Sequence, residues 1–234
     1  IRMITADSVV RREIMVTKQT ETFTLPVSQE PLSFRFDEGA WLLGTVTTDQ
    51  TPAELAAMAK HDLEYGARHW ALRALAGSTA AVADSARRFI LLNERESSLR
   101  ALALGQLAGR RDTTDLPLIR SALRDPASEV RGGAIVAWAR FDSAAARPTA
   151  REMLLTDPSS SVRERAVSVL DPADPATLEL LIARTTPAWP LGLRQTAASR
   201  IRNQPQPAVV SALEALTAPS EPRNLREAGL RYLA

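Results

Sequence analysis

The chain has 234 residues, and its 29 basic and 27 acidic residues leave a formal net charge of +2. This near balance disfavours a nucleic-acid partner, although the isoelectric point is about 9.5. The absence of cysteine excludes disulfides and thiolate metal sites and leaves cytoplasmic and periplasmic locations open, and the lack of a run of about 18 apolar residues predicts a soluble chain without a membrane span.

The first residues, Ile1-Arg2-Met3, lack the charged and then apolar layout of a signal peptide. A strand-like pattern begins almost immediately after them. We therefore expect the chain to be a fragment or a processed product of a longer polypeptide.

Residues 1–50 form the first predicted domain, a partial β-sandwich. Turn signals at Gln29-Glu30-Pro31 and Glu38-Gly39 punctuate this region. Since a small sheet is marginal alone, we expect its partner to be upstream sequence or the first helices. Four short segments rich in β-branched and aromatic residues predict three or four antiparallel strands, namely 11–17, 20–27, 32–37 and 41–47.

Residues 51–234 form the second predicted domain, which is helical. Thr51-Pro52 is a favourable helix start, with a hydroxyl cap followed by proline at the first helical position. An arginine then recurs every 31 or 32 residues, and the residues at offsets −1, +3, +4 and +7 from it are apolar or small. These offsets trace one face of a helix, so the pattern predicts an α-α solenoid of about six two-helix repeats. The periodic arginines are Arg68, Arg100, Arg131, Arg163, Arg194 and Arg226.

An acidic residue precedes four of these arginines by six positions, in the turn between the two helices of a repeat. The acids are Asp62, Glu94, Asp125 and Asp157, and the equivalent positions in the last two repeats are Ala188 and Ser220. An acid in the turn can cap the second helix, and the arginine can reach the acid of an adjacent repeat. We therefore predict a structural ladder between repeats rather than a row of anion-binding sites, because a ligand site rarely recurs in every unit of an array. The predicted ladder comprises Asp62, Arg68, Arg100, Asp125, Arg131, Asp157, Arg163, Arg194 and Arg226.

Two repeats carry the motif Asp-Pro-x-x-x-Val-Arg-x-x-Ala, at Asp125–Ala134 and at Asp157–Ala166. This two-helix unit resembles HEAT repeats, specifically the short bacterial type, over residues of about 52 to 234. The resemblance implies a fold and leaves function open, since such arrays serve many roles.

A second resemblance covers some 25 residues of the first region. Phe23-Thr24-Leu25-Pro26 is followed by Phe36-Asp37, Gly39 and Trp41-Leu42-Leu43, with Leu32 and Phe34 in the strand between them. This order is similar to the junction in zinc aminopeptidases of the alanyl-aminopeptidase family (gluzincins), where a β-sandwich leads into an all-helical C-terminal domain. The resemblance implies a metallopeptidase parent with zinc in an upstream catalytic domain, which would be a hydrolase partner within the same polypeptide.

No residue of this chain is assigned to catalysis or to metal binding. The family's His-Glu-x-x-His and Gly-x-Met-x-Asn motifs do not occur here, and no cofactor is expected in the chain itself. The two histidines, His61 and His69, are eight residues apart, which is not the spacing of a zinc-binding helix. Trp70 and Trp189 are compatible with packing and are also candidate contacts for a peptide or protein partner.

Two functions of different classes follow. The chain is either the non-catalytic C-terminal cap of a zinc aminopeptidase, which shapes peptide access to the active site, or a HEAT-repeat adaptor that binds a protein partner on its concave face. Nucleic-acid binding is the weakest reading, because acids precede most of the periodic arginines.

Overall fold

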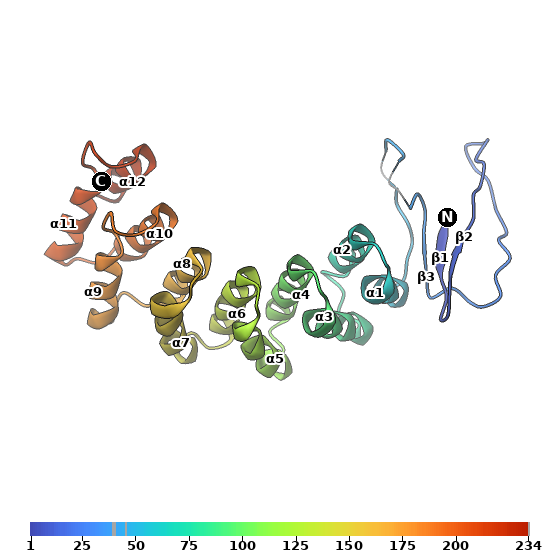
Figure 1. The fold of residues 1–234 in the computed structure, drawn as a ribbon, viewed down its shortest axis with the longest axis horizontal. Coiled ribbons are helices and arrows are strands. Elements are labelled where there is room, and N and C mark those ends of the chain that lie inside the picture. Colours follow the sequence, from blue (N-terminus) through green and yellow to red (C-terminus); the bar gives the residue numbers. More distant parts are fainter. Residues whose placement is uncertain (39–40, 45, 234) are drawn as a thin grey trace. The chain divides into compact units, whose positions relative to one another are not determined.

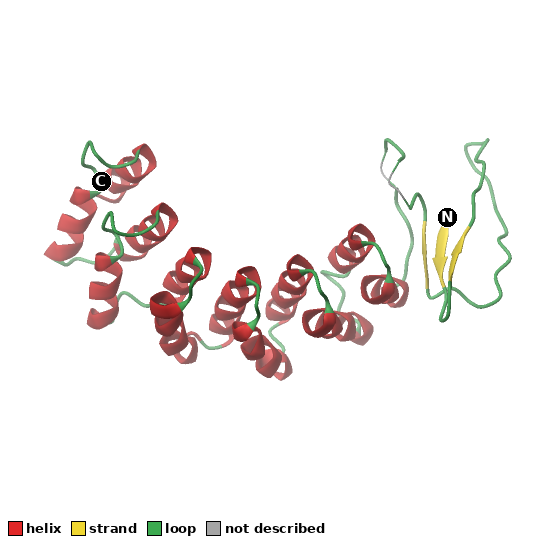
Figure 2. Cartoon of the chain, viewed as in Figure 1, coloured by secondary structure: helices red, strands yellow, loops and turns green. Residues whose placement is uncertain are grey.

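The structure is a computed structural model that describes residues 1–38, 41–44 and 46–233 (Figure 1). The chain forms two compact units, Ile1–Gln106 and Leu107–Ala234. The first unit holds all the β-strands and the first helices, and the second unit is helical (Figure 2). The predicted domain boundary at residue 50 stays a prediction.

Three short antiparallel strands form the sheet in the order β2-β1-β3. They are β1 (Arg2–Ile4), β2 (Val9–Arg11) and β3 (Ser33–Arg35). Met3 of the central strand pairs with Val10 on one side and with Phe34 on the other. All three residues of β1 are buried, so the central strand forms the core of the sheet.

The sequence predicted more strand residues than the structure contains. The segment 20–27 has no regular structure, and the part of 41–47 that the structure describes is not a strand either; Thr45 lies outside the described residues. The pattern at 11–17 contributes only Arg11, at the end of β2. In these segments the apolar side chains have no facing layer: Phe23 is 39% exposed and Trp41 is 85% exposed. Alternation predicts a strand only where one face becomes buried.

Four helices follow the sheet: α1 (Pro52–His61), α2 (Tyr65–Ala74), α3 (Ala81–Asn93) and α4 (Ser97–Arg110). The predicted start of α1 is confirmed. Thr51 Oγ1 accepts the Glu54 amide, while the Glu54 carboxylate accepts the Thr51 amide at 2.7 Å, which completes a capping box.

Within the second unit the helices alternate between two rows, with α5, α7, α9 and α11 in one row and α6, α8, α10 and α12 in the other (Figure 1). Short 3-10 turns, η1 (Thr113–Asp115) and η2 (Ala122–Arg124), flank α5. The helices of this unit are α5 (Leu116–Ser121), α6 (Ser128–Phe141), α7 (Ser143–Thr156), α8 (Ser160–Val169), α9 (Pro175–Ala183), α10 (Leu191–Ile201), α11 (Pro207–Ala215) and α12 (Arg223–Leu233).

The periodic apolar positions form the core of the helical array. The residue just before each periodic arginine is at most 2% exposed in all six repeats. In the last repeat the pattern is incomplete, because Leu230 is 61% exposed and Leu233 is 40% exposed. The predicted fold class is confirmed: the chain is mainly helical, with a short antiparallel sheet followed by a solenoid-like array of helix pairs. Among the described residues, no helix is long and apolar enough to cross a membrane.

Gly132 explains one unusual feature of the sequence, the glycine pair inside α6. A Cβ at this position would lie 2.5 Å from Cδ of Arg165, a residue of α8. The missing side chain therefore lets the Arg165 stem lie against the backbone of α6.

Candidate functional site

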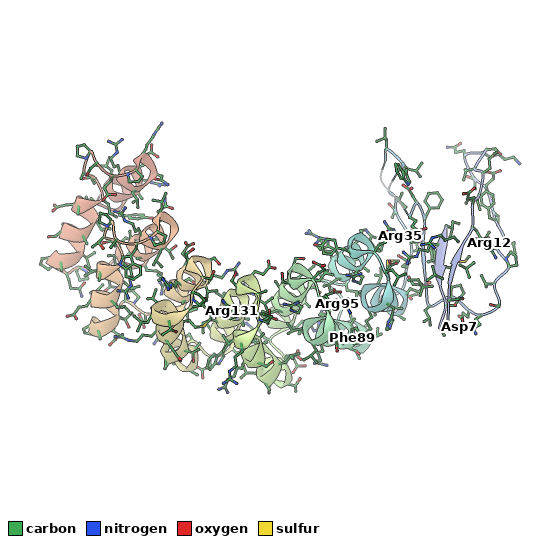
Figure 3. The ribbon with its side chains drawn as sticks, in the orientation of Figure 1. Asp7, Arg12, Arg35, Phe89, Arg95 and Arg131 are labelled. Atoms are coloured by element: carbon green, nitrogen blue, oxygen red, sulfur yellow. The ribbon has the colours of Figure 1, made fainter. Side chains whose placement is uncertain are left out.

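Several of the periodic arginines form ion pairs with acids one repeat further along the chain. Arg131 of α6, labelled in Figure 3, donates from Nε to Asp157 Oδ2 at 2.9 Å and from Nη2 to Asp157 Oδ1 at 3.0 Å. Its Nη1 donates to the carbonyl groups of Asp125 and Pro126 in its own repeat. One guanidinium thus ties together two consecutive turns, and the bidentate geometry makes this a strong form of ion pair.

The same arrangement recurs in both units. Arg68 Nε lies 2.8 Å from Glu94 Oε2 in the first unit, and Arg194 Nη2 lies 2.7 Å from Glu221 Oε1 in the second. The acid also caps its own turn, since Asp157 Oδ1 accepts the Ser159 amide at 2.9 Å.

These contacts shift the pKa values of the paired groups. Burial raises the pKa of Asp157, but hydrogen bonds from Arg131 and the Ser159 amide outweigh it, so the pKa of this carboxyl is below its ordinary value. The pKa of Glu94 is lowered in the same way, with burial opposed by the Glu96 amide and Arg68. The hydrogen bond from Asp157 raises the pKa of Arg131 in turn.

Two other predicted ladder arginines also bind carbonyl groups of the turn in their own repeat. Arg100 Nη1 donates to the carbonyl groups of Glu94 and Arg95, and Arg163 Nε donates to the Asp157 carbonyl at 2.6 Å. Arg226 Nε is buried and has no hydrogen-bond partner among the described residues. That these contacts act as staples between repeats stays a prediction.

The acid of the first turn, Asp62, has a partner that the sequence did not reveal. Arg2 of strand β1 donates from Nη1 to Asp62 Oδ1 at 2.9 Å, and both side chains are almost fully buried. Since Asp62 Oδ1 also accepts the Glu64 amide, the carboxylate behaves like the other turn acids. A strand arginine therefore occupies the place that a helical arginine takes in later repeats, and no periodicity could have indicated it.

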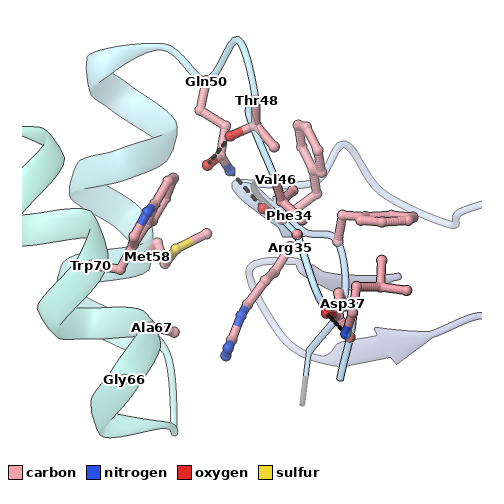
Figure 4. A pocket seen from close by; sticks show the side chains of 13 residues that line it. Phe34, Arg35, Asp37, Val46, Thr48, Gln50, Met58, Gly66, Ala67 and Trp70 are labelled. Atoms are coloured by element: carbon pink, nitrogen blue, oxygen red, sulfur yellow. Dashed lines mark hydrogen bonds between the residues drawn. The ribbon is translucent and has the colours of Figure 1, made fainter. Parts of the chain in front are cut away.

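An open cavity of about 390 Å³ lies in the first unit, between the segment that contains β3 and the helices α1 and α2 (Figure 4). Most of its lining is apolar. Trp70, one of the two predicted contact residues, lines it and is 45% exposed. The other large side chains around it include Phe34, Phe36, Leu42, Val46 and Met58.

The polar groups of the cavity are engaged with one another or with neighbouring residues. Arg35 Nη1 lies 2.5 Å from Glu64 Oε2, and Gln50 Nε2 donates to the Phe34 carbonyl at 2.5 Å. Asp37 accepts the amides of Trp41 and Leu42. The described lining therefore forms an apolar recess whose polar side chains are held by hydrogen bonds and an ion pair.

Trp189, the second predicted contact residue, lies in the turn before α10. The guanidinium of Arg184 lies over its ring at 4.4 Å, which is a cation–π contact. Burial lowers the pKa of Arg184, and the nearby charge of Arg163 lowers it further.

The described residues contain no group of three histidine, cysteine or acidic side chains that could hold a metal ion. His61 lies near the Phe89 ring, with centroids 6.0 Å apart, and His69 stacks on Tyr65 at 5.7 Å. Both histidines therefore pack against aromatic rings in this structure.

Comparison with known proteins supports the reading of the repeats. Residues 86–171 match the family model of HEAT repeats. The helical array has the HEAT-repeat architecture. Among solved structures, human deoxyhypusine hydroxylase in complex with glycerol is similar at 18% identity over 79% of this chain and 84% of that chain, with a TM-score of 0.36. At that score the likeness carries no argument about this chain. No curated protein matches the sequence.

Proposed function

We propose that this chain is a HEAT-repeat scaffold that binds a protein partner, and that the cavity beside Trp70 receives an apolar or aromatic side chain of that partner. The observation that carries this proposal is the cavity itself, which is mostly apolar, open to solvent and flanked by a half-exposed tryptophan. Tryptophan is enriched among the residues that dominate binding at protein interfaces.

The polar side chains around the cavity favour a protein as the binding partner over a small charged ligand. Arg35 is paired with Glu64, and Asp37 accepts two backbone amides, so both charged residues in the described lining already have partners. An apolar side chain entering the cavity would bury Trp70 without breaking either interaction.

Filling the cavity tests this proposal. Gly66 lines the cavity on α2, and a Cβ there would meet no atom within 4 Å, so Gly66→Leu places a side chain into open space. Gly105 on α4 has the same freedom and does not line the cavity, so Gly105→Leu is the matched control.

The experiment is quantitative affinity capture with four baits: the wild-type chain, Gly66→Leu, Gly105→Leu and Trp70→Ala. A protein recovered by wild type and by Gly105→Leu, but lost with Gly66→Leu and Trp70→Ala, supports the proposal. Equal recovery with all four baits would show that the cavity is not the binding site.

We infer a second candidate function, the cap of a zinc aminopeptidase, from the resemblance of residues 23–43 to the junction in that family. In its favour, β3 coincides with the strand that the resemblance requires, and a helical array follows it. In that case the chain would act by restricting and orienting peptides at an upstream zinc site, while contributing no catalytic residue.

The reading frame before Ile1 tests this second candidate. A His-Glu-x-x-His helix with a distal glutamate would support it, and aminopeptidase activity should then be measured on the full-length protein with zinc. A reading frame without these motifs would remove it.

A further inference from the structure

The contact between helix α8 and the turn before α10, called the junction below, lacks the turn acid that Arg131 uses one repeat earlier. Arg131 pairs with Asp157, which lies six residues before Arg163. The equivalent position for Arg163 is Ala188, six residues before Arg194, and alanine supplies no carboxylate. Arg163 has no ion-pair partner among the described residues and uses Nε to bind the Asp157 carbonyl.

A second arginine lies close to this junction. Arg184, at the end of α9, rests on the half-buried ring of Trp189, and its buried Nε has no hydrogen-bond partner among the described residues. Burial lowers its pKa, and the charge of Arg163 lowers it further. Helix α10 begins here at Leu191, and its N-cap, Pro190, provides no side-chain acceptor.

The other charged groups around the junction leave it positive. Arg194 of α10 is occupied by Glu221 and the Thr185 carbonyl. The carboxylate of Glu164 on α8 lies against Gly192, since a Cβ there would be 2.5 Å from Glu164 Oε1, yet it forms no ion pair with either arginine among the described residues. Among the described residues, Arg163 and Arg184 thus form no ion pair, although the Glu164 carboxylate lies beside the first turn of α10.

We propose that the junction between α8 and α10 accepts an acidic side chain, aspartate or glutamate, from the protein partner. The template is within the same unit: Asp157 shows that one carboxylate can receive both a guanidinium and the amide at the start of the following helix. Here Arg163 and the uncapped start of α10 offer the same two kinds of donor, and Trp189 offers an apolar surface for the stem of the side chain. This inference rests on the proposed scaffold function and adds an acidic residue to the partner's binding segment.

The test is a titration of the whole chain with a blocked peptide that contains three consecutive glutamates, against its glutamine counterpart. Binding is followed by the NMR shifts of the Trp189 indole and the Gly192 amide. We expect the glutamate peptide alone to bind, and Arg163→Gln to weaken it about fivefold, as for loss of one partly exposed ion pair. Arg120→Gln is the control for loss of one arginine charge at another helix pair of the same unit, where Arg120 lies over Trp138 at 4.8 Å.

A second variant keeps the test independent of lost stability. Ala188→Asp adds the missing acid at an exposed position. It should therefore raise the melting temperature of the chain and lower its affinity for the glutamate peptide. Glu164→Gln should strengthen binding by removing the competing charge.

Equal binding of both peptides, or an unchanged affinity in Arg163→Gln, would overturn the inference. Tighter binding of duplex DNA with the same shifts would also overturn it in favour of a nucleic-acid site. If the glutamate peptide does not bind while Gly66→Leu still abolishes partner capture, the proposal of an acidic partner residue is refuted and the cavity proposal stands. If the peptide binds but Gly66→Leu has no effect on capture, the cavity proposal fails instead.

Discussion

Arg2 and Asp62 are sixty residues apart in sequence and form a direct hydrogen bond of 2.9 Å with both side chains out of contact with solvent. Glu38 and Glu64 add carboxylate oxygens at 3.5 and 3.6 Å from the same nitrogen. The bond joins the central strand of the sheet to the first turn of the helical array, so it fixes how the first unit is put together.

Removing Arg2 should therefore destabilise the first unit strongly. Arg2→Met leaves the Asp62 carboxylate buried without its cation, which costs about 3–5 kcal/mol for a pair of this kind. Urea unfolding followed by circular dichroism measures this loss. Arg12→Met is the control, since Arg12 is exposed and should change stability by less than about 0.5 kcal/mol. The double variant Arg2→Met with Asp62→Asn should lose less than the sum of the two single losses, because the unpaired charge is gone. Simple additivity would mean that the two side chains are not coupled.

The ion pair between Arg131 and Asp157 should make the free energy of unfolding depend on pH. Because the folded-state pKa of Asp157 is lowered, its contribution is complete above the unfolded-state value of about 3.9 and is lost as the pH falls through the folded-state value. Asp157→Asn should cost about 1–3 kcal/mol at pH 7 and much less at pH 2. Unfolding by guanidinium chloride, measured for the wild type and the variant at both pH values, tests this. An equal cost at both would indicate that the carboxylate charge is irrelevant.

The capping box at the start of α1 should contribute measurably. Thr51→Ala removes the acceptor for the Glu54 amide and should reduce the free energy of unfolding by about 1 kcal/mol. Thr51→Ser keeps a hydroxyl at the same place and should retain most of it. If both variants lose the same amount, the methyl group rather than the hydroxyl is responsible.

Two helical glycines should respond oppositely to alanine. Gly105 has no atom within 4 Å of an added Cβ, so Gly105→Ala should stabilise the chain by about 1 kcal/mol through helix propensity. At Gly132 the same change must displace the Arg165 side chain, which lies 2.5 Å from the added carbon, so the gain should shrink or reverse. Thermal unfolding of the two variants provides the comparison, and an equal gain at both sites would refute the role of Arg165.

The repeats were predictable because one local pattern recurs six times. Positions such as Val130 and Ala134, which flank Arg131, must be buried on the same helix face in each unit, and they are. The sheet was predicted less well, since strands need partners from elsewhere in the chain. Residues 20–27 alternate as a strand does but find none. The cavity beside Trp70 depends on how the described part of residues 34–50 packs against α1 and α2, a long-range arrangement that local patterns do not encode. Sequence reasoning named Trp70 as a candidate partner contact, which stays a prediction, but could not place Arg35 or Gln50 near it.

The Arg2–Asp62 contact also limits how this chain can be rebuilt. Where both turns carry the acid, as at Asp125 and Asp157, a cut at one turn rejoined at the other, 32 residues away, keeps an arginine in register with an acid, so these repeats are exchangeable. The sheet is not exchangeable in this way. A helix pair inserted between residue 50 and α1 would move Asp62 away from Arg2 and bury two orphaned charges at once. A designer who wishes to lengthen the array should therefore add repeats after the first turn, and should choose repeats whose turn carries the acid, so that each new joint has its own matched pair.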